Sequence, residues 1–162
     1  MRSRRTIEAM SRLDTAWLRM EKPTNPMMIT GVLMFAEPMT LSELKRVVRD
    51  RFLDYRRFRQ KPVEGTAGWN WEEDPDFDLD FHLRSAVLQG AGDDRELDAL
   101  FARIAERHLD RRHPLWQVTL VDGLADDRQA LILKYHHCLA DGVAAFTTFS
   151  RVFSDAEREP LP

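Results

Sequence analysis

The sequence of 162 residues contains a single cysteine, Cys138. One cysteine cannot form an intrachain disulfide, so a small secreted scaffold held together by disulfides is excluded. No apolar run reaches the roughly 18 residues that a membrane-spanning helix needs. Basic residues open the chain at Arg2, Arg4 and Arg5, but no continuous apolar segment follows them as it would in a signal peptide. These absences favour a cytoplasmic protein in a reducing environment.

Glycine and proline are also few, at 7 and 8 residues, which excludes collagen-like and low-complexity chains. Lys and Arg (24) do not outnumber Asp and Glu (27), and the net charge is −3. A nucleic-acid-binding domain usually carries a basic excess, so we expect no nucleic-acid partner. What the chain does have is 43% apolar and 31% charged residues, which is typical of one globular domain with a core.

Hydrophobic periodicity predicts helices interspersed among strands. A capping box at Thr40 and Glu43 marks the start of one helix. The predicted helices span residues 11–20, 41–54, 93–109 and 142–153. The predicted strands span 28–35, 56–64, 68–73, 115–121 and 129–137, and residues 76–83 are predicted as a half-buried strand or extended segment. This order favours an α/β (α+β) sandwich. Residues 1–10 form a basic N-terminal segment, residues 11–153 the domain, and residues 154–162 a linker or truncated tail.

One motif combines residues that can take part in catalysis, namely His136-His137-x-x-x-Asp141-Gly142. It lies where a predicted strand gives way to a helix, and alternation along the strand directs the two histidines to opposite faces. One imidazole there can serve as a general base near neutral pH. Asp141 can hold the loop or simply cap the helix, and Gly142 permits a tight turn. Cys138 is better read as a small buried apolar residue than as a nucleophile.

The motif resembles the HHxxxDG signature of CoA-dependent acyltransferases, and three further blocks narrow the resemblance. The first comprises Leu13-Asp14-x-x-Trp17-Leu18-x-x-Glu21 with Pro26-Met27. The second comprises Arg57-Phe58-Arg59 with Trp71-Glu72-x-Asp74-Pro75-x-Phe77-Asp78-x-x-x-His82. The third comprises Asp110-Arg111-Arg112 followed by Pro114-Leu115-Trp116. Together these blocks are similar to bacterial wax ester synthase/diacylglycerol acyltransferases, from about residue 11 to 153.

The resemblance implies a chloramphenicol acetyltransferase-like domain, with a mixed sheet flanked by helices, that is one half of a two-domain architecture. The second domain, on the same or a separate chain, is missing from this sequence. The chain is then a fragment, a processed product or a stand-alone domain, and an uncovered interface would favour a homo-oligomer. Family members also contact membranes or lipid inclusions peripherally. The arginine-rimmed first helix fits such contact and equally fits a core helix.

The implied function is an acyl-CoA-dependent O-acyltransferase that makes wax esters or triacylglycerol. The resemblance assigns the general base to His137, an accessory position to His136 and a structural role to Asp141. Gly142, Pro114, Leu115 and Trp116 are motif-supporting positions. The resemblance implies no metal and no cofactor, and it implies acyl-CoA as a co-substrate. The acceptor is either a long-chain alcohol or diacylglycerol, and the sequence does not choose between them.

Two alternatives remain. The first is a non-catalytic lipid-binding or dimerisation module that keeps the motif to fix a loop. The second is a domain similar to the condensation domains of peptide synthetases. Condensation domains share the histidine motif but not the Leu13-Asp14 opening together with Pro114-Leu115-Trp116, so the acyltransferase interpretation is preferred.

Overall fold

A computed structural model describes residues 7–35 and 37–139 of the chain. Asp141, Gly142, the helix predicted over 142–153 and the tail over 154–162 lie outside the described residues. The strands are β1 (Ile7–Ala9), β2 (Met28–Phe35), β3 (Gln60–Gly65), β4 (Gly68–Glu73), β5 (Leu83–Val87), β6 (Trp116–Asp122) and β7 (Gln129–His136). The helices are α1 (Arg12–Met20), α2 (Leu41–Val47), α3 (Leu79–His82) and α4 (Asp94–Ala105), with shorter turns at Val48–Phe52, Arg56–Arg59 and Ala125–Asp127.

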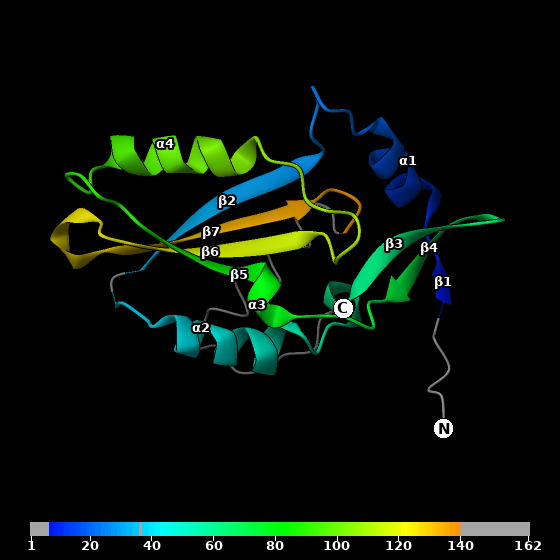
Figure 1. Cartoon of the computed structure of the whole chain (residues 1–162), viewed down its shortest axis with the longest axis horizontal. Helices are drawn as coiled ribbons and strands as arrows, with labels where there is room; N and C mark the ends of the chain where they lie inside the picture. Colours follow the sequence, from blue (N-terminus) through cyan, green and yellow to red (C-terminus); the bar gives the residue numbers. More distant parts are fainter. Residues whose placement is uncertain (1–6, 36, 140–162) are drawn as a thin grey trace.

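The larger sheet has the strand order β2-β7-β6-β5 and lies between helices on its two faces (Figure 1). It is mixed, because β5 runs parallel to β6 while the other pairs are antiparallel. Every residue of β7 is buried. Leu131 and Leu133 join the core on the α2 side, whereas Ala130 and Ile132 join the core under α4. The predicted sandwich with a mixed sheet flanked by helices is confirmed.

The smaller sheet is antiparallel, with the order β1-β4-β3, and lies next to α1 (Figure 1). The hairpin between β3 and β4 matches the strand pair expected from the sequence, although Arg56–Arg59 forms a short helical turn before β3. Strand β1 was not expected, since residues 1–10 showed only basic character. All three of its residues are exposed, so it lacks the apolar alternation that marks a half-buried strand.

Helix starts follow the expected capping chemistry. Thr40 and Glu43 form the predicted capping box, with each side chain satisfying a backbone N–H of the other residue. Ser11 caps α1 and Asp93 caps α4 in the same way, by accepting a hydrogen bond from a backbone N–H in the first turn. None of the helices within residues 7–35 and 37–139 has the length and apolar character to cross a membrane.

Two further predicted elements differ from the structure. The strand over 76–83 is wrong, because Asp78 caps the short helix α3 over residues 79–82. The helix bends the chain so that His82 becomes buried and its Nδ1 lies 2.8 Å from the carbonyl oxygen of Trp116. The helix expected over 93–109 already ends at Ala105. The ammonium group of Lys134 donates to the carbonyl of Ile104 in the last turn of the helix and to the carbonyl of Arg107 just beyond its end.

Candidate active site

The proposed base, His137, lies in the turn directly after β7. Its backbone N–H donates to the carbonyl oxygen of Met27 at 2.8 Å. Its imidazole ring stacks on the indole of Trp17 in α1, with ring centroids 4.5 Å apart and an angle of 19° between the planes. The side chain is half-buried. Residue 137 is therefore held through its backbone and through one ring face, while part of it remains open to solvent.

The preceding residue, His136, is fully buried at the end of β7. Its backbone N–H donates to the carbonyl oxygen of Leu115 at 3.0 Å, and its Nδ1 lies 3.0 Å from the backbone N–H of Cys138. Burial lowers the pKa of His136 to about 4, so the ring is neutral near pH 7. Since Nδ1 accepts a hydrogen bond, the proton of the neutral ring resides on Nε2. The two histidines therefore have different surroundings.

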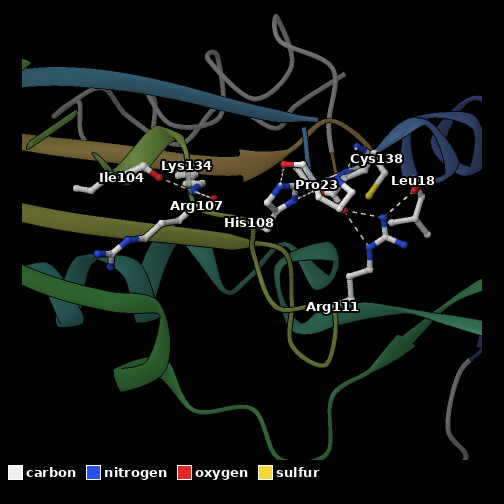
Figure 2. Close-up of polar contacts among 10 residues, drawn as sticks. Leu18, Pro23, Ile104, Arg107, His108, Arg111, Lys134 and Cys138 are labelled. Carbon is white, nitrogen blue, oxygen red and sulfur yellow. Dashed lines mark hydrogen bonds and ion pairs between the residues drawn. The ribbon is translucent and has the colours of Figure 1, made fainter. Parts of the chain in front are cut away.

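A carboxylate lies beside His136. Oε1 of Glu21 is 3.8 Å from Nε2 of His136 and 3.0 Å from Nδ1 of His108. Arg111 donates two hydrogen bonds to Oε2 of Glu21, at 2.6 and 3.1 Å, and a third to the carbonyl of Leu18 at 2.7 Å. Figure 2 shows Arg111 reaching toward Leu18 and His108 lying close to Pro23. We call Glu21, His108, Arg111 and His136 the Glu21 cluster.

The charge state of Glu21 follows from these contacts. Only 7% of its side chain is exposed, and burial alone would raise the pKa of the carboxyl group. The hydrogen bonds from Arg111 and His108 outweigh burial, and the pKa of Glu21 lies below its ordinary value. The carboxylate is therefore negative near neutral pH, and it faces the neutral ring of His136.

The Pro-Leu-Trp block supports the site from the core side. Leu115 and Trp116 are buried, and the carbonyl oxygen of Leu115 is the acceptor that holds His136. The indole N–H of Trp116 donates to the carbonyl of Phe58 at 2.8 Å, and its rings stack on His82 at 4.3 Å between centroids. Residues from the second and third blocks thus meet in one core beneath the end of β7.

Cys138 is buried beside the two histidines, with 1% of its surface exposed. Burial raises the pKa of its thiol to about 12, so the thiolate needed for nucleophilic attack is not formed at neutral pH. Its contribution to the site is the backbone N–H that binds Nδ1 of His136. The interpretation of Cys138 as a buried apolar residue agrees with this environment.

Sequence reasoning did not assign a role to Trp17, Glu21, His108 or Arg111. Trp17, Glu21 and Arg111 do belong to the sequence blocks that carry the family resemblance, so their positions in those blocks could have drawn attention to them. Their partners, however, lie far along the chain: Arg111 is 90 residues after Glu21. Only the fold brings the first block, the third block and the histidine motif together.

A hollow of about 540 Å³ opens on the α4 side of the larger sheet. Its walls include Leu100 and Ile104 of α4 and Trp116 of β6, and its polar lining includes Thr119 and Lys134. His108 belongs both to the wall of this hollow and to the Glu21 cluster. The cluster therefore lies between the turn that carries His137 and the space beneath α4.

Comparison with solved structures defines the class of fold. The wax ester synthase/diacylglycerol acyltransferase from Marinobacter aquaeolei VT8 superposes with a TM-score of 0.81 at 29% identity, over 96% of this chain and 39% of that chain. The starter condensation domain of rhizomide synthetase superposes with a TM-score of 0.74 at 17% identity, over 91% of this chain and 36% of that chain. At that identity, the second match shows a shared fold alone.

Comparison with sequences identifies the family. Residues 10–162 match the wax ester synthase/diacylglycerol acyltransferase catalytic domain. The probable diacylglycerol O-acyltransferase tgs3 of Mycobacterium tuberculosis is 34% identical over 160 residues, which are 95% of this chain and 59% of that protein. The probable diacylglycerol O-acyltransferase tgs1 of the same species is 41% identical over 105 residues, covering 65% of this chain and 22% of that protein. The chain belongs to the wax ester synthase/diacylglycerol acyltransferase family, which confirms the resemblance. It spans less than two thirds of these relatives.

Proposed function

We propose that the chain carries the general-base half of an acyl-CoA-dependent O-acyltransferase, with His137 as the base. The observation that supports this most strongly is the placement of His137: its backbone is fixed by Met27 and one ring face by Trp17, yet the side chain is only half-buried. A neutral imidazole in such a position can accept a proton from a bound hydroxyl group.

In the proposed reaction, His137 takes the proton of an alcohol as the alcohol oxygen attacks the thioester carbonyl of acyl-CoA. The carbon–sulfur bond then breaks, and the proton passes from His137 to the departing CoA thiolate. An ester and free CoA are the products, and no covalent bond to the protein forms. Holding both substrates side by side supplies much of the rate increase in a reaction of this kind.

The names of the family's members support two acceptor classes. The relatives in M. tuberculosis are named as diacylglycerol O-acyltransferases, and the solved structure is named for both wax ester synthesis and diacylglycerol acylation. We propose a lipid hydroxyl, either a long-chain alcohol or diacylglycerol, as the acceptor. Asp141 keeps its proposed role of fixing the loop after His137.

We also propose that turnover needs a second domain on the same or another chain. The support comes from the length of the relatives, since the chain aligns with only 59% of tgs3 and 39% of the solved acyltransferase. Contact with a membrane surface and self-association stay predictions. The non-catalytic module and the condensation-like domain are less favoured, because residues 10–162 match the catalytic domain of wax ester synthase/diacylglycerol acyltransferases and a relative with 34% identity is named as an O-acyltransferase.

The test is product analysis. The complete polypeptide that contains this domain would be incubated with mixed acyl-CoA species, a long-chain alcohol and diacylglycerol, and the lipids measured by mass spectrometry. Wax ester or triacylglycerol that appears together with free CoA supports the proposal and identifies the acceptor. Acyl-CoA that remains intact in the presence of both acceptors would contradict it.

A further inference from the structure

We propose that Glu21 and Arg111 are positioning residues that hold His136, and through it the turn carrying His137, in the geometry needed for acyl transfer. The inference rests on the proposed function of His137. It concerns an ion pair, with a buried carboxylate and a half-buried guanidinium group, that joins the end of α1 to the connection between α4 and β6. Neither residue lies in the histidine motif.

The first step is the anchoring of the carboxylate. Nε and Nη2 of Arg111 both donate to Oε2 of Glu21, and Nη2 also donates to the carbonyl of Leu18, so three hydrogen bonds hold one edge of the guanidinium group. His108 lies 3.0 Å from Oε1 through its Nδ1 and 3.3 Å from the carbonyl of Pro23 through its Nε2. A carboxylate with partners on both oxygens is fixed in position and orientation.

The second step is the orientation of His136. Its Nε2 is buried and has no hydrogen-bond partner among the described residues. The negatively charged Oε1 of Glu21 lies 3.8 Å from this nitrogen. This distance exceeds a hydrogen bond. Even so, a negative oxygen facing the N–H in a buried site favours the proton on Nε2 and leaves Nδ1 free to accept. The Glu21 cluster thereby selects one tautomer and one ring orientation of His136.

The third step connects His136 to the base. Nδ1 of His136 accepts the N–H of Cys138, and its carbonyl oxygen accepts the N–H of Leu139 at 2.9 Å. These two bonds define the turn in which His137 stands, since residues 138 and 139 follow it directly. A rotated His136, or one with the proton on Nδ1, loses the bond to Cys138. His137 would then shift relative to Trp17.

A purely structural interpretation must be tested against this one. Buried ion pairs often add little net stability, because desolvation offsets the attraction. The pair could serve only to attach α1 to the loop before β6. The structural and the positioning interpretations predict different losses when Glu21 or Arg111 is substituted. A structural pair affects the melting temperature, whereas a positioning pair affects kcat at temperatures at which the protein remains folded.

The kinetic experiment compares neighbouring arginines in the complete acyltransferase. Arg111→Met should lower kcat by about 10- to 100-fold, as expected for a displaced catalytic group, while the KM values for acyl-CoA and acceptor change by less than about threefold. Arg112→Met is the matched control, since Arg112 has the same charge and, among residues 7–35 and 37–139, pairs only with the nearby Asp110. Its side chain is 84% exposed, so its kcat should equal that of the wild type.

The second experiment uses NMR on the present chain and does not depend on activity. Nitrogen shifts of the imidazoles should report His136 as the neutral Nε2–H tautomer, with ring contacts between Trp17 and His137. Glu21→Gln, which is isosteric and removes the charge, should mix the tautomers and weaken those contacts. If the wild-type chain shows this state while the complete acyltransferase transfers no acyl group, Glu21 still orients His136 but the proposed function fails.

Two results would overturn the inference. One is a Glu21→Gln protein with an unchanged His136 tautomer and unchanged Trp17–His137 contacts. The other is an Arg111→Met protein that keeps its kcat while its melting temperature falls, which would show that the pair is structural only. If Arg111→Met does not fold, Glu21→Gln provides both readouts, because it retains the volume and most of the hydrogen-bonding capacity of the side chain.

Discussion

The indole of Trp17 and the imidazole of His137 lie nearly parallel, 4.5 Å apart between ring centroids. One ring belongs to α1 near the start of the chain and the other to the turn after β7. The stack covers one face of the imidazole and restricts its rotation. The position of the proposed base therefore depends on the contact between α1 and the larger sheet.

The stack leads to a prediction for Trp17. Replacing it with Leu removes an aromatic contact worth about 0.5–1.5 kcal/mol, and an equal loss of transition-state stabilisation corresponds to roughly 2- to 10-fold in kcat. Trp17→Phe keeps a flat ring and should retain most of the activity. Steady-state kinetics of the complete enzyme measure both variants. Equal kcat values for wild type and Trp17→Leu would show that the stack does not position the base.

Acid should destabilise the fold through two buried histidines. Burial lowers the pKa of His82 and of His136 to about 4, below the ordinary value of 6.5. The unfolded chain therefore binds more protons than the folded chain between about pH 6.5 and 4. The free energy of unfolding falls as the pH decreases through this window, by up to roughly 3 kcal/mol for each histidine.

Urea unfolding of this chain at a series of pH values checks the prediction, with His82→Phe as the informative variant. Phenylalanine can retain the ring packing against Trp116 and Phe77, but it cannot take up a proton. The variant should lose the part of the pH dependence that His82 contributes, up to roughly 3 kcal/mol between pH 6.5 and 4. Superimposable pH profiles for the two proteins would show that His82 does not titrate on unfolding.

Cys138 should be unreactive in the folded protein. Its thiol is buried and has a pKa raised to about 12, so iodoacetamide near pH 8 should label it only after unfolding in guanidinium. Cys138→Ala should keep most of the acyl-transfer rate, because the backbone N–H that binds His136 remains. Rapid labelling of the native protein would instead place a reactive thiolate beside His137.

The sequence predicted local features well where one interaction dominates. The capping box at Thr40 and Glu43 needs only residues three apart, and it forms as expected. The opposite orientation of His136 and His137 follows from strand alternation. It stays a prediction, because β7 ends at His136 and His137 already lies in the turn beyond it. These features depend on short-range geometry, which a sequence displays directly.

Other features depend on contacts that no local pattern contains. The alternation of apolar and polar residues over 76–83 predicted a strand. In the structure His82 packs between Phe77 and Trp116, and the chain bends into α3 so that His82 is buried. The pairing of Glu21 with Arg111 joins segments 90 residues apart. The family resemblance pointed to both of those residues without indicating that they touch.

The most direct test of the account is the rate of CoA release by a His137→Ala variant of the complete enzyme, given acyl-CoA and the acceptor identified by product analysis. Loss of general-base catalysis should lower the turnover at least 100-fold, while circular dichroism and the melting temperature stay close to those of the wild type. A folded His137→Ala protein that retains full turnover would contradict the assignment of His137 as the general base.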